Sequence, residues 1–180
     1  ANYELSDEDL AEIQEAFDIP ASIIETLAAD EQRNLLILNR AEEMCRRHRR
    51  FIIFAATKEH AVVLATVLRA RGVWAHAVTG ETPGPERARI IAAYKEDSDE
   101  PRILVNFGVL TTGFDAPRTS GAIIARPTKS LVLFSQMVGR ATRGTKAGGN
   151  KRAEVVTVVD TRLPGFCNMA EAFENWEDVW

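Results

Sequence analysis

Three polar side chains that suit phosphate chemistry recur between residues 136 and 143. Gln136, Arg140 and Arg143 stand at positions i, i+4 and i+7, so on a helix they form one stripe. Two guanidinium groups on one stripe match the charge that spreads over the equatorial oxygens of a transferred phosphoryl group. Gly139 has no side chain, which leaves room for a polyanion to approach the helix closely. The spacing alone also fits a solvent-exposed helix face that carries two arginines, so the neighbouring segments are needed to distinguish these two interpretations.

A second polar segment follows an apolar run at residues 102–106. Thr111 and Thr112 offer hydroxyl donors and Gly113 a backbone N–H, the groups that hold phosphate oxygens without reading bases. Asp115 could accept a hydrogen bond from a ribose hydroxyl, and its alternative use is to cap a neighbouring helix. This segment predicts a contact with a nucleotide or a nucleic-acid backbone.

Two further strand ends carry polar groups. Thr57 follows the apolar run 51–55, and Thr79 and Gly80 follow the next predicted strand. A helix that starts after a buried strand presents backbone N–H groups to phosphate. Thr57 could equally cap that helix through its hydroxyl, and the two roles are compatible.

The elements that must position these residues alternate between strands and helices. Short apolar runs typical of buried strands are separated by amphipathic segments, after a helical lead-in over residues 6–47. This order predicts an α/β fold with an open, mostly parallel sheet and helices on both faces, and ligands at the carboxyl ends of the strands. The expected strands are 51–55, 73–78, 102–106, 121–125 and 154–159, and the expected helices are 58–71, 85–95 and 131–142.

Taken together, these segments resemble superfamily 2 helicases and translocases. Residues 136–143 have the form Q-x-x-G-R-x-x-R of motif VI, residues 109–117 resemble motif V, and residues 51–58 resemble motif IV. The resemblance implies a RecA-like three-layer sandwich with a mostly parallel central sheet. We expect a helical lead-in over 1–49, the C-terminal helicase lobe over 50–163, and a helical extension over 164–180.

The resemblance also implies a division of roles. The chain would be the C-terminal motor lobe of an ATP-dependent helicase or translocase, with ATP and Mg²⁺ bound mainly by a first lobe. It has no G-x-x-x-x-G-K-[ST] phosphate loop, so we interpret it as an excised part that is inactive alone. The implied catalytic residues are Arg140, Arg143 and Gln136, the implied ATP contacts Gly113, Asp115 and Gly139, and the implied nucleic-acid contacts Thr57, Thr79, Gly80, Thr111 and Thr112.

Residues 125–130 are similar to the subset that includes Ssl2-like DNA repair helicases and the motor subunits of type I and type III restriction enzymes. This resemblance favours DNA over RNA, and nuclease or repair proteins as further partners. One alternative is a non-catalytic scaffold with a helicase-like fold. Another is a free-standing Rossmann enzyme, but no G-x-G-x-x-G follows the first strand.

Net charge, cysteine spacing and hydropathy bear on nucleic-acid binding, metal binding and membrane contact. The net charge of −4 neither supports nor excludes nucleic acid, since a local basic groove can coexist with an acidic remainder. Cys45 and Cys167 have no partner at metal-ligand spacing, so we expect no metal site. No apolar stretch approaches membrane-spanning length and no signal peptide opens the chain, which predicts a cytoplasmic protein without membrane contact. The cluster Arg46, Arg47, Arg49 and Arg50 is interpreted as complementing a helix C-terminus.

Overall fold

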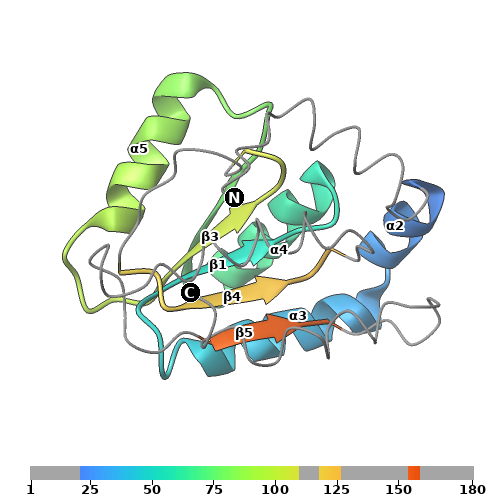
Figure 1. Ribbon diagram of the computed structural model, residues 1–180, viewed down its shortest axis with the longest axis horizontal. Helices are drawn as coiled ribbons and strands as arrows, with labels where there is room; N and C mark the ends of the chain where they lie inside the picture. The colour runs from blue at the N-terminus through green and yellow to red at the C-terminus, as the bar shows by residue number, and fades with distance from the viewer. Residues whose placement is uncertain (1–20, 110–117, 127–153, 159–180) are drawn as a thin grey trace, which may run out of the picture.

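The computed structural model describes residues 21–109, 118–126 and 154–158. These residues form helices α2 (Ala21–Ala28), α3 (Glu31–Met44), α4 (Lys58–Ala70) and α5 (Gly84–Lys95). The strands are β1 (Arg50–Phe54), β2 (Trp74–Val78), β3 (Arg102–Asn106), β4 (Gly121–Ile124) and β5 (Glu154–Thr157). Figure 1 shows the strands side by side, with their arrows pointing the same way.

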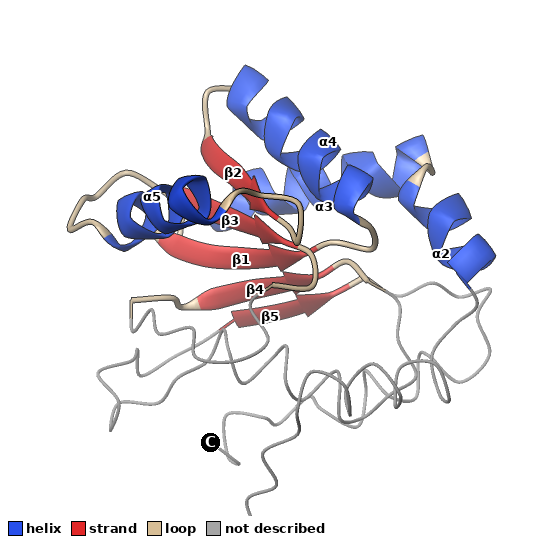
Figure 2. Ribbon diagram, turned by 90° about the horizontal axis from the view of Figure 1, so that it is seen from above, coloured by secondary structure: helices blue, strands red, loops and turns tan. Residues whose placement is uncertain are grey.

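The five strands form one sheet in the order β2-β3-β1-β4-β5, and every pairing is parallel. Figure 2 shows this order across the sheet. β1 lies at the centre, with Ile52 beside Leu104 of β3 and Ala122 of β4. All five residues of β1 are buried, which explains why Phe51–Phe54 is a continuous apolar run rather than an alternating one.

Helices cover both faces of the sheet. On one face, Ile37 and Met44 of α3 and Leu64 of α4 pack with Phe51 and Ile53. On the other face, Ile90 and Tyr94 of α5 pack with the side chains that point the opposite way, including Ile52 and Leu104. The chain moves from β1 outward to β2 and then back to β3, so right-handed connections place α4 and α5 on opposite faces. The result is a three-layer arrangement.

Local signals explain where the helices begin and end. The Asp30 carboxylate accepts hydrogen bonds from the backbone N–H groups of Gln32 and Arg33 and so caps α3. After α4, Gly72 has a φ of 85°, and the next residue, Val73, donates its N–H to the Leu68 carbonyl oxygen. This is a Schellman ending, which favours glycine because the left-handed conformation crowds a Cβ atom.

The predicted elements agree with the structure wherever it describes them, with ends that differ by two residues at most, and the sheet is parallel throughout the described strands. The expected helix 131–142 and the whole of the segments 1–20 and 159–180 lie outside the described residues. The described part of the helical lead-in, residues 21–47, contains the two helices α2 and α3, and α3 packs in the core of the lobe. Four apolar residues of the predicted helices are exposed instead of packed: Leu35, Leu36, Val62 and Val63.

Candidate nucleic-acid interface

The parallel sheet brings the predicted polar groups to one edge. Parallel strands end at the same side, so Thr57 after β1 and Thr79 and Gly80 after β2 share the carboxyl edge. β1 connects toward β2 and β4 connects toward β5, in opposite directions along the sheet. In open α/β sheets, ligands bind at such a switch point. The loops after β1 and β4 therefore flank the expected ligand position.

Thr57 begins α4. Its backbone is extended, with φ −142° and ψ 168°, and its Oγ1 accepts a hydrogen bond from the His60 backbone N–H at 3.0 Å. This is the capping role expected for threonine at a helix start. The side chain is half-buried, and its O–H remains able to donate because the cap uses only an oxygen lone pair. Capping and phosphate contact are thus compatible in one residue.

His60 holds the same loop from within α4, a role that the sequence did not reveal. Its Nδ1 accepts from the Ala56 backbone N–H at 3.0 Å, so its Nε2–H donates to the Asn34 Oδ1 at 2.7 Å. The side chain is 2% exposed. Burial, and to a lesser extent the positive charge of Arg33, lower the pKa of His60 to about 4. The ring is therefore neutral at neutral pH, in the tautomer with the proton on Nε2.

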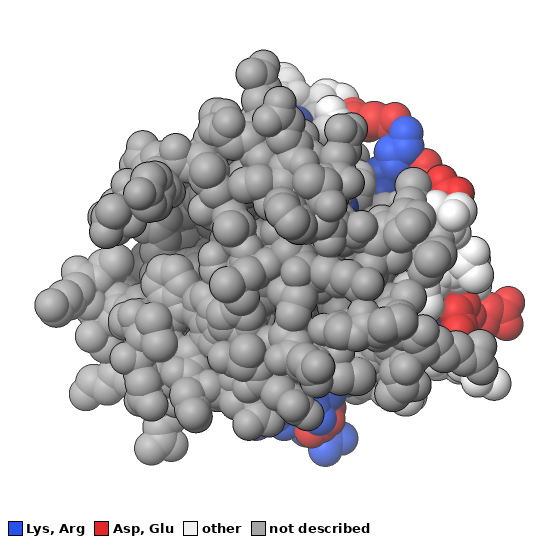
Figure 3. Space-filling model, turned by 45° about the vertical axis from the view of Figure 1, so that its right-hand side comes forward, with Lys and Arg blue, Asp and Glu red and all other residues white. Residues whose placement is uncertain are grey.

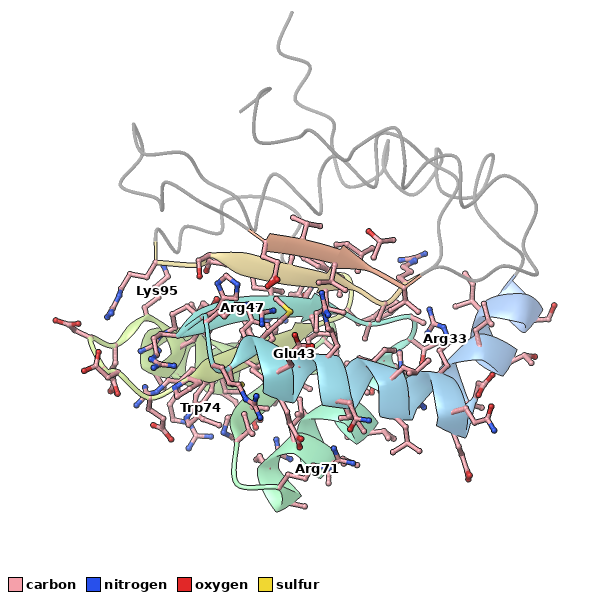
Figure 4. The ribbon with its side chains drawn as sticks, turned by 90° about the horizontal axis from the view of Figure 1, so that it is seen from below. Arg33, Glu43, Arg47, Arg71, Trp74 and Lys95 are labelled. Atoms are coloured by element: carbon pink, nitrogen blue, oxygen red, sulfur yellow. The ribbon has the colours of Figure 1, made fainter. Side chains whose placement is uncertain are left out.

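The first turn of α3 reaches both sides of the switch point. Asn34 contacts His60 behind the β1 loop, and its Nδ2 donates to the Ala28 carbonyl oxygen at 2.9 Å. The adjacent Arg33 is buried and donates from a guanidinium nitrogen to the carbonyl oxygen of Ala125, directly after β4. Figure 4 shows Arg33 near the end of α3 that adjoins α2. One helical turn thus binds the ends of two neighbouring strands.

The loop after β2 is a tight turn from Thr79 to Thr82. The Thr82 N–H donates to the Thr79 carbonyl oxygen at 3.1 Å, and the Thr79 N–H donates to the Thr82 Oγ1 at 3.0 Å. The Thr79 hydroxyl oxygen accepts from the Glu81 N–H at 3.2 Å, and the residue is only 5% exposed. Gly80 is exposed, and a Cβ built on it meets no described atom within 4 Å. Gly80, more than the Thr79 side chain, presents this turn to a ligand.

An ion pair joins the loops after β1 and β2. The Lys58 ammonium lies 2.5 Å from a Glu81 carboxylate oxygen, and this contact raises the pKa of Lys58. Both side chains are substantially exposed, so the pair contributes little to stability. Lys58 adds a positive charge beside Thr57, while Glu81 partly neutralises it. The carboxyl edge thus carries a cation whose access depends on a neighbouring acid.

The loops after β3 and β4 lead to the segments expected to carry motifs V and VI. The Asn106 Oδ1 accepts from the Val109 N–H at 3.2 Å, and Gly108 has a φ of 74°, which favours glycine. The Arg126 guanidinium lies 5.7 Å from the centre of the Phe107 ring, a cation–π contact between the two loops. The described start of each of these two loops is therefore held by specific contacts.

The arginine cluster lies at the opposite edge of the sheet. The buried Arg50 donates to the backbone carbonyl oxygens of Arg49, Glu96, Ser98 and Glu100. The Arg47 guanidinium forms a bidentate pair with Glu154 and also contacts Glu43. In Figure 4, Arg47 and Glu43 lie toward the end of α3 opposite Arg33. Arg47 and Arg50 thus make structural contacts with distant segments, and Arg49 donates to the Cys45 carbonyl oxygen at the C-terminus of α3, which is the role interpreted from the sequence.

Few described side chains are visible in Figure 3, and among them basic groups lie next to acidic ones. Within the described ranges, no three histidine, cysteine or acidic side chains converge as a metal site. In the same ranges, no helix is long and apolar enough to cross a membrane.

Eight of the predicted site residues lie outside the described part of the chain. They are Thr111, Thr112, Gly113, Asp115, Gln136, Gly139, Arg140 and Arg143. Of the remaining three, the structure places Thr57 and Gly80 at accessible turns and buries Thr79. Sequence patterns gave no sign of His60, Asn34 and Arg33, because the contacts between His60 and Asn34 and between Arg33 and Ala125 join residues that are distant in sequence.

The helicase conserved C-terminal domain family matches residues 30–145 of this sequence. The chain belongs to this family. The match includes the whole motif VI string and begins at α3, which agrees with the packing of α3 in the core.

Relatives with curated names are helicases where the name states an activity. IRC3, an ATP-dependent helicase of Saccharomyces cerevisiae, is 35% identical over 92 residues, which are 51% of this chain and 13% of the relative. PRP5, a pre-mRNA-processing ATP-dependent RNA helicase of Kluyveromyces lactis, is 29% identical over 113 residues, which are 63% of this chain and 13% of the relative. This chain thus spans a small part of each of these relatives.

Solved structures show the same fold at low identity. The DEAD-box protein SrmB of E. coli has a TM-score of 0.65 and 20% identity, with 79% of each chain covered. The T4 protein UvsW has a TM-score of 0.63 and 20% identity, covering 86% of this chain and 30% of that one. The C-terminal domain of Dbp5 has a TM-score of 0.62 and 23% identity. The three-layer arrangement is therefore the RecA-like fold of helicase C-terminal lobes.

Proposed function

We propose that this helicase C-terminal domain is the second motor lobe of an ATP-dependent helicase or translocase that acts on DNA, with RNA as the alternative substrate. The observation that carries the proposal is the family match across residues 30–145, because it includes the string Gln136–Arg143. The partner lobe would supply the phosphate loop that this sequence lacks.

The nucleic-acid backbone would bind across the carboxyl edge of the sheet. Thr57 and Gly80 are accessible there, and Lys58 adds a positive charge. Thr111 and Thr112 follow β3 and would extend the same row of donors. Hydroxyl, backbone N–H and ammonium groups contact phosphates without reading bases, so the grip would be independent of sequence and sensitive to salt.

ATP with Mg²⁺ would be held mainly by the first lobe, with this lobe closing over its phosphates. Gly113, Asp115 and Gly139 would contact the nucleotide, and Gln136 would orient the reacting groups. Arg140 and Arg143 would neutralise the charge that develops on the γ-phosphate, a contribution of about 10³ to 10⁵ in rate for an arginine finger. Closure of the two lobes on ATP and their release after hydrolysis would then move the protein along a nucleic-acid strand.

The test is the ATPase activity of the full-length parent with no nucleic acid, with single- and double-stranded DNA, and with RNA. We expect Arg140→Ala or Arg143→Ala to lower stimulated turnover at least a hundredfold with little change in ATP affinity. Arg46→Ala is the matched control, because this exposed arginine lies beyond the amino edge of the sheet.

Two outcomes would redirect the proposal. Full activity in both arginine variants would remove the finger role and favour the non-catalytic scaffold. Stimulation by RNA alone would replace DNA with RNA as the substrate, as in PRP5, which is named as an RNA helicase.

A further inference from the structure

The loop after β1 needs support that the sheet does not give. The last ladder contact is the Ala55 N–H donating to the Asn106 carbonyl oxygen at 2.9 Å. The next N–H, that of Ala56, lies beyond the ladder in a residue that is 2% exposed. A buried backbone N–H without an acceptor destabilises the folded state, because it gives up its hydrogen bond to water without replacing it. The His60 Nδ1 supplies that acceptor, at 3.0 Å.

His60 contacts the loop at two consecutive residues. Its ring accepts from Ala56, and its own backbone N–H donates to the Thr57 hydroxyl oxygen. The second contact determines which lone pair of Thr57 is used, and hence where the Thr57 O–H can point. The ring itself is fixed by Asn34, which is in turn held to the Ala28 carbonyl oxygen. The chain of contacts thus runs from α2 through α3 to the loop.

We propose that His60 is a positioning residue that holds the loop after β1 in the conformation in which Thr57 contacts the nucleic-acid backbone. The proposal rests on the proposed function, since it assumes that Thr57 binds nucleic acid. His60 touches no ligand itself and acts only through Ala56 and Thr57. The low pKa of His60 agrees with this role, because the ring must stay neutral for Nδ1 to accept a hydrogen bond.

Two substitutions test the contacts of the two His60 ring nitrogens separately. In His60→Asn, the amide oxygen stands as many bonds from Cβ as Nδ1 does, so it can accept from Ala56 but cannot reach Asn34. In His60→Gln, the amide nitrogen stands as many bonds from Cβ as Nε2 does, so it can reach Asn34 but leaves Ala56 without its acceptor. Both variants remove the ring, so the loss of packing and of a titratable group is common to them.

The measurement is the nucleic-acid concentration that half-saturates the ATPase of the full-length parent, with the turnover at saturation. We expect His60→Gln to raise the half-saturating concentration about tenfold, the effect of one hydrogen bond, with turnover at saturation unchanged. His60→Asn should stay within about twofold of the wild type. Thermal unfolding of each variant shows whether the comparison is between folded proteins.

A double-mutant cycle tests whether His60 acts through Thr57. If it does, adding His60→Gln to Thr57→Val should weaken nucleic-acid binding no further than Thr57→Val does alone. Full additivity of the two effects would overturn the proposal, as would equal binding by the Asn and Gln variants. If His60→Gln does not fold, Asn34→Ala is the alternative variant, because it keeps the His60 ring but removes the contact that fixes it. Asn34→Ala should raise the half-saturating concentration. No change would again overturn the proposal.

Failure of the proposed function gives a different result. A wild-type parent that binds neither DNA nor RNA would remove the function and this role together. A wild-type parent that binds nucleic acid while the His60 variants match each other would remove only the role of His60.

Discussion

Acidification should destabilise this lobe through His60. The pKa of His60 is about 4 in the folded lobe, because burial and Arg33 oppose a positive ring, and the ordinary value is 6.5. Between these two pH values the unfolded chain binds a proton that the folded chain does not, so stability falls as pH falls. Above pH 6.5 the contribution of His60 is complete, and it is lost as pH decreases through this window.

The size of the effect follows from the two pKa values. Linkage gives a loss of about 2 kcal/mol at pH 5 and about 3 kcal/mol at pH 4, relative to pH 7. This is a large part of the stability of a small domain, which is roughly 5–15 kcal/mol. The titration of His60 alone would therefore remove a substantial part of the stability of the lobe by pH 4.

The assay is urea denaturation of the 180-residue chain at several pH values, for the wild type and for His60→Asn. Other titrating groups are common to both proteins, so the difference in the free energy of unfolding isolates His60. We expect this difference to shrink as pH falls from 7 to 4, because only the wild type loses the His60 contribution. A difference that stays constant over this range would refute the assignment of a neutral, buried His60.

Three further predictions concern other contacts. Gly108→Ala should lower the free energy of unfolding by about 1 kcal/mol because of the φ of 74°, whereas Gly80→Ala should cost less; equal losses in urea denaturation would contradict this. Arg50→Met should cost about 3 kcal/mol in the same assay, because the guanidinium donates to four backbone carbonyl oxygens, and a loss below 1 kcal/mol would show that water replaces it. Glu81→Gln should tighten nucleic-acid binding by the parent protein, because it removes the acid that neutralises Lys58. Lys58→Met should weaken binding and reduce the slope of log affinity against log salt concentration by about 1. An unchanged slope in Lys58→Met would exclude Lys58 from the phosphate contacts.

Local sequence patterns predicted the helices and strands because the burial of each element is reflected in the types of its own residues. The run Phe51–Ala55 is apolar on both sides because helices cover both faces of the sheet, and this is visible in the letters alone. Thr57 indicated the start of α4 because its hydroxyl can cap a helix, and the structure ends α4 before Gly72, whose φ of 85° favours glycine. The order of the strands was not predictable in this way, because it depends on pairings between distant segments.

The exposed valines show a limit of counting apolar residues. Val62 and Val63 are apolar members of α4, yet each is about half exposed, while Ala61 and Leu64 face the sheet. A helix turns about 100° per residue, so a run of four apolar residues cannot point to one side. Only the position of the sheet decides which of them are buried.

The candidate site was predicted in part. Thr57 and Gly80 are accessible at the expected edge because both follow strands whose positions the pattern already indicated. His60 was not predicted, because its role depends on Asn34, 26 residues away in sequence. The same holds for Arg33, whose acceptor Ala125 is 92 residues away. Contacts of this kind leave no local periodicity.

The order of the strands has a consequence for synthesis on the ribosome. β1, β2 and β3 emerge before β4, so one whole side of the central strand lacks its partner until about residue 124 has been made. That open side belongs to the apolar run Phe51–Phe54 and displays unpaired backbone groups, which are a template for association with other chains. Slow translation of the segment between β3 and β4 would lengthen this exposure. The nascent lobe is therefore expected to remain prone to aggregation, and dependent on chaperones, until β4 has been made.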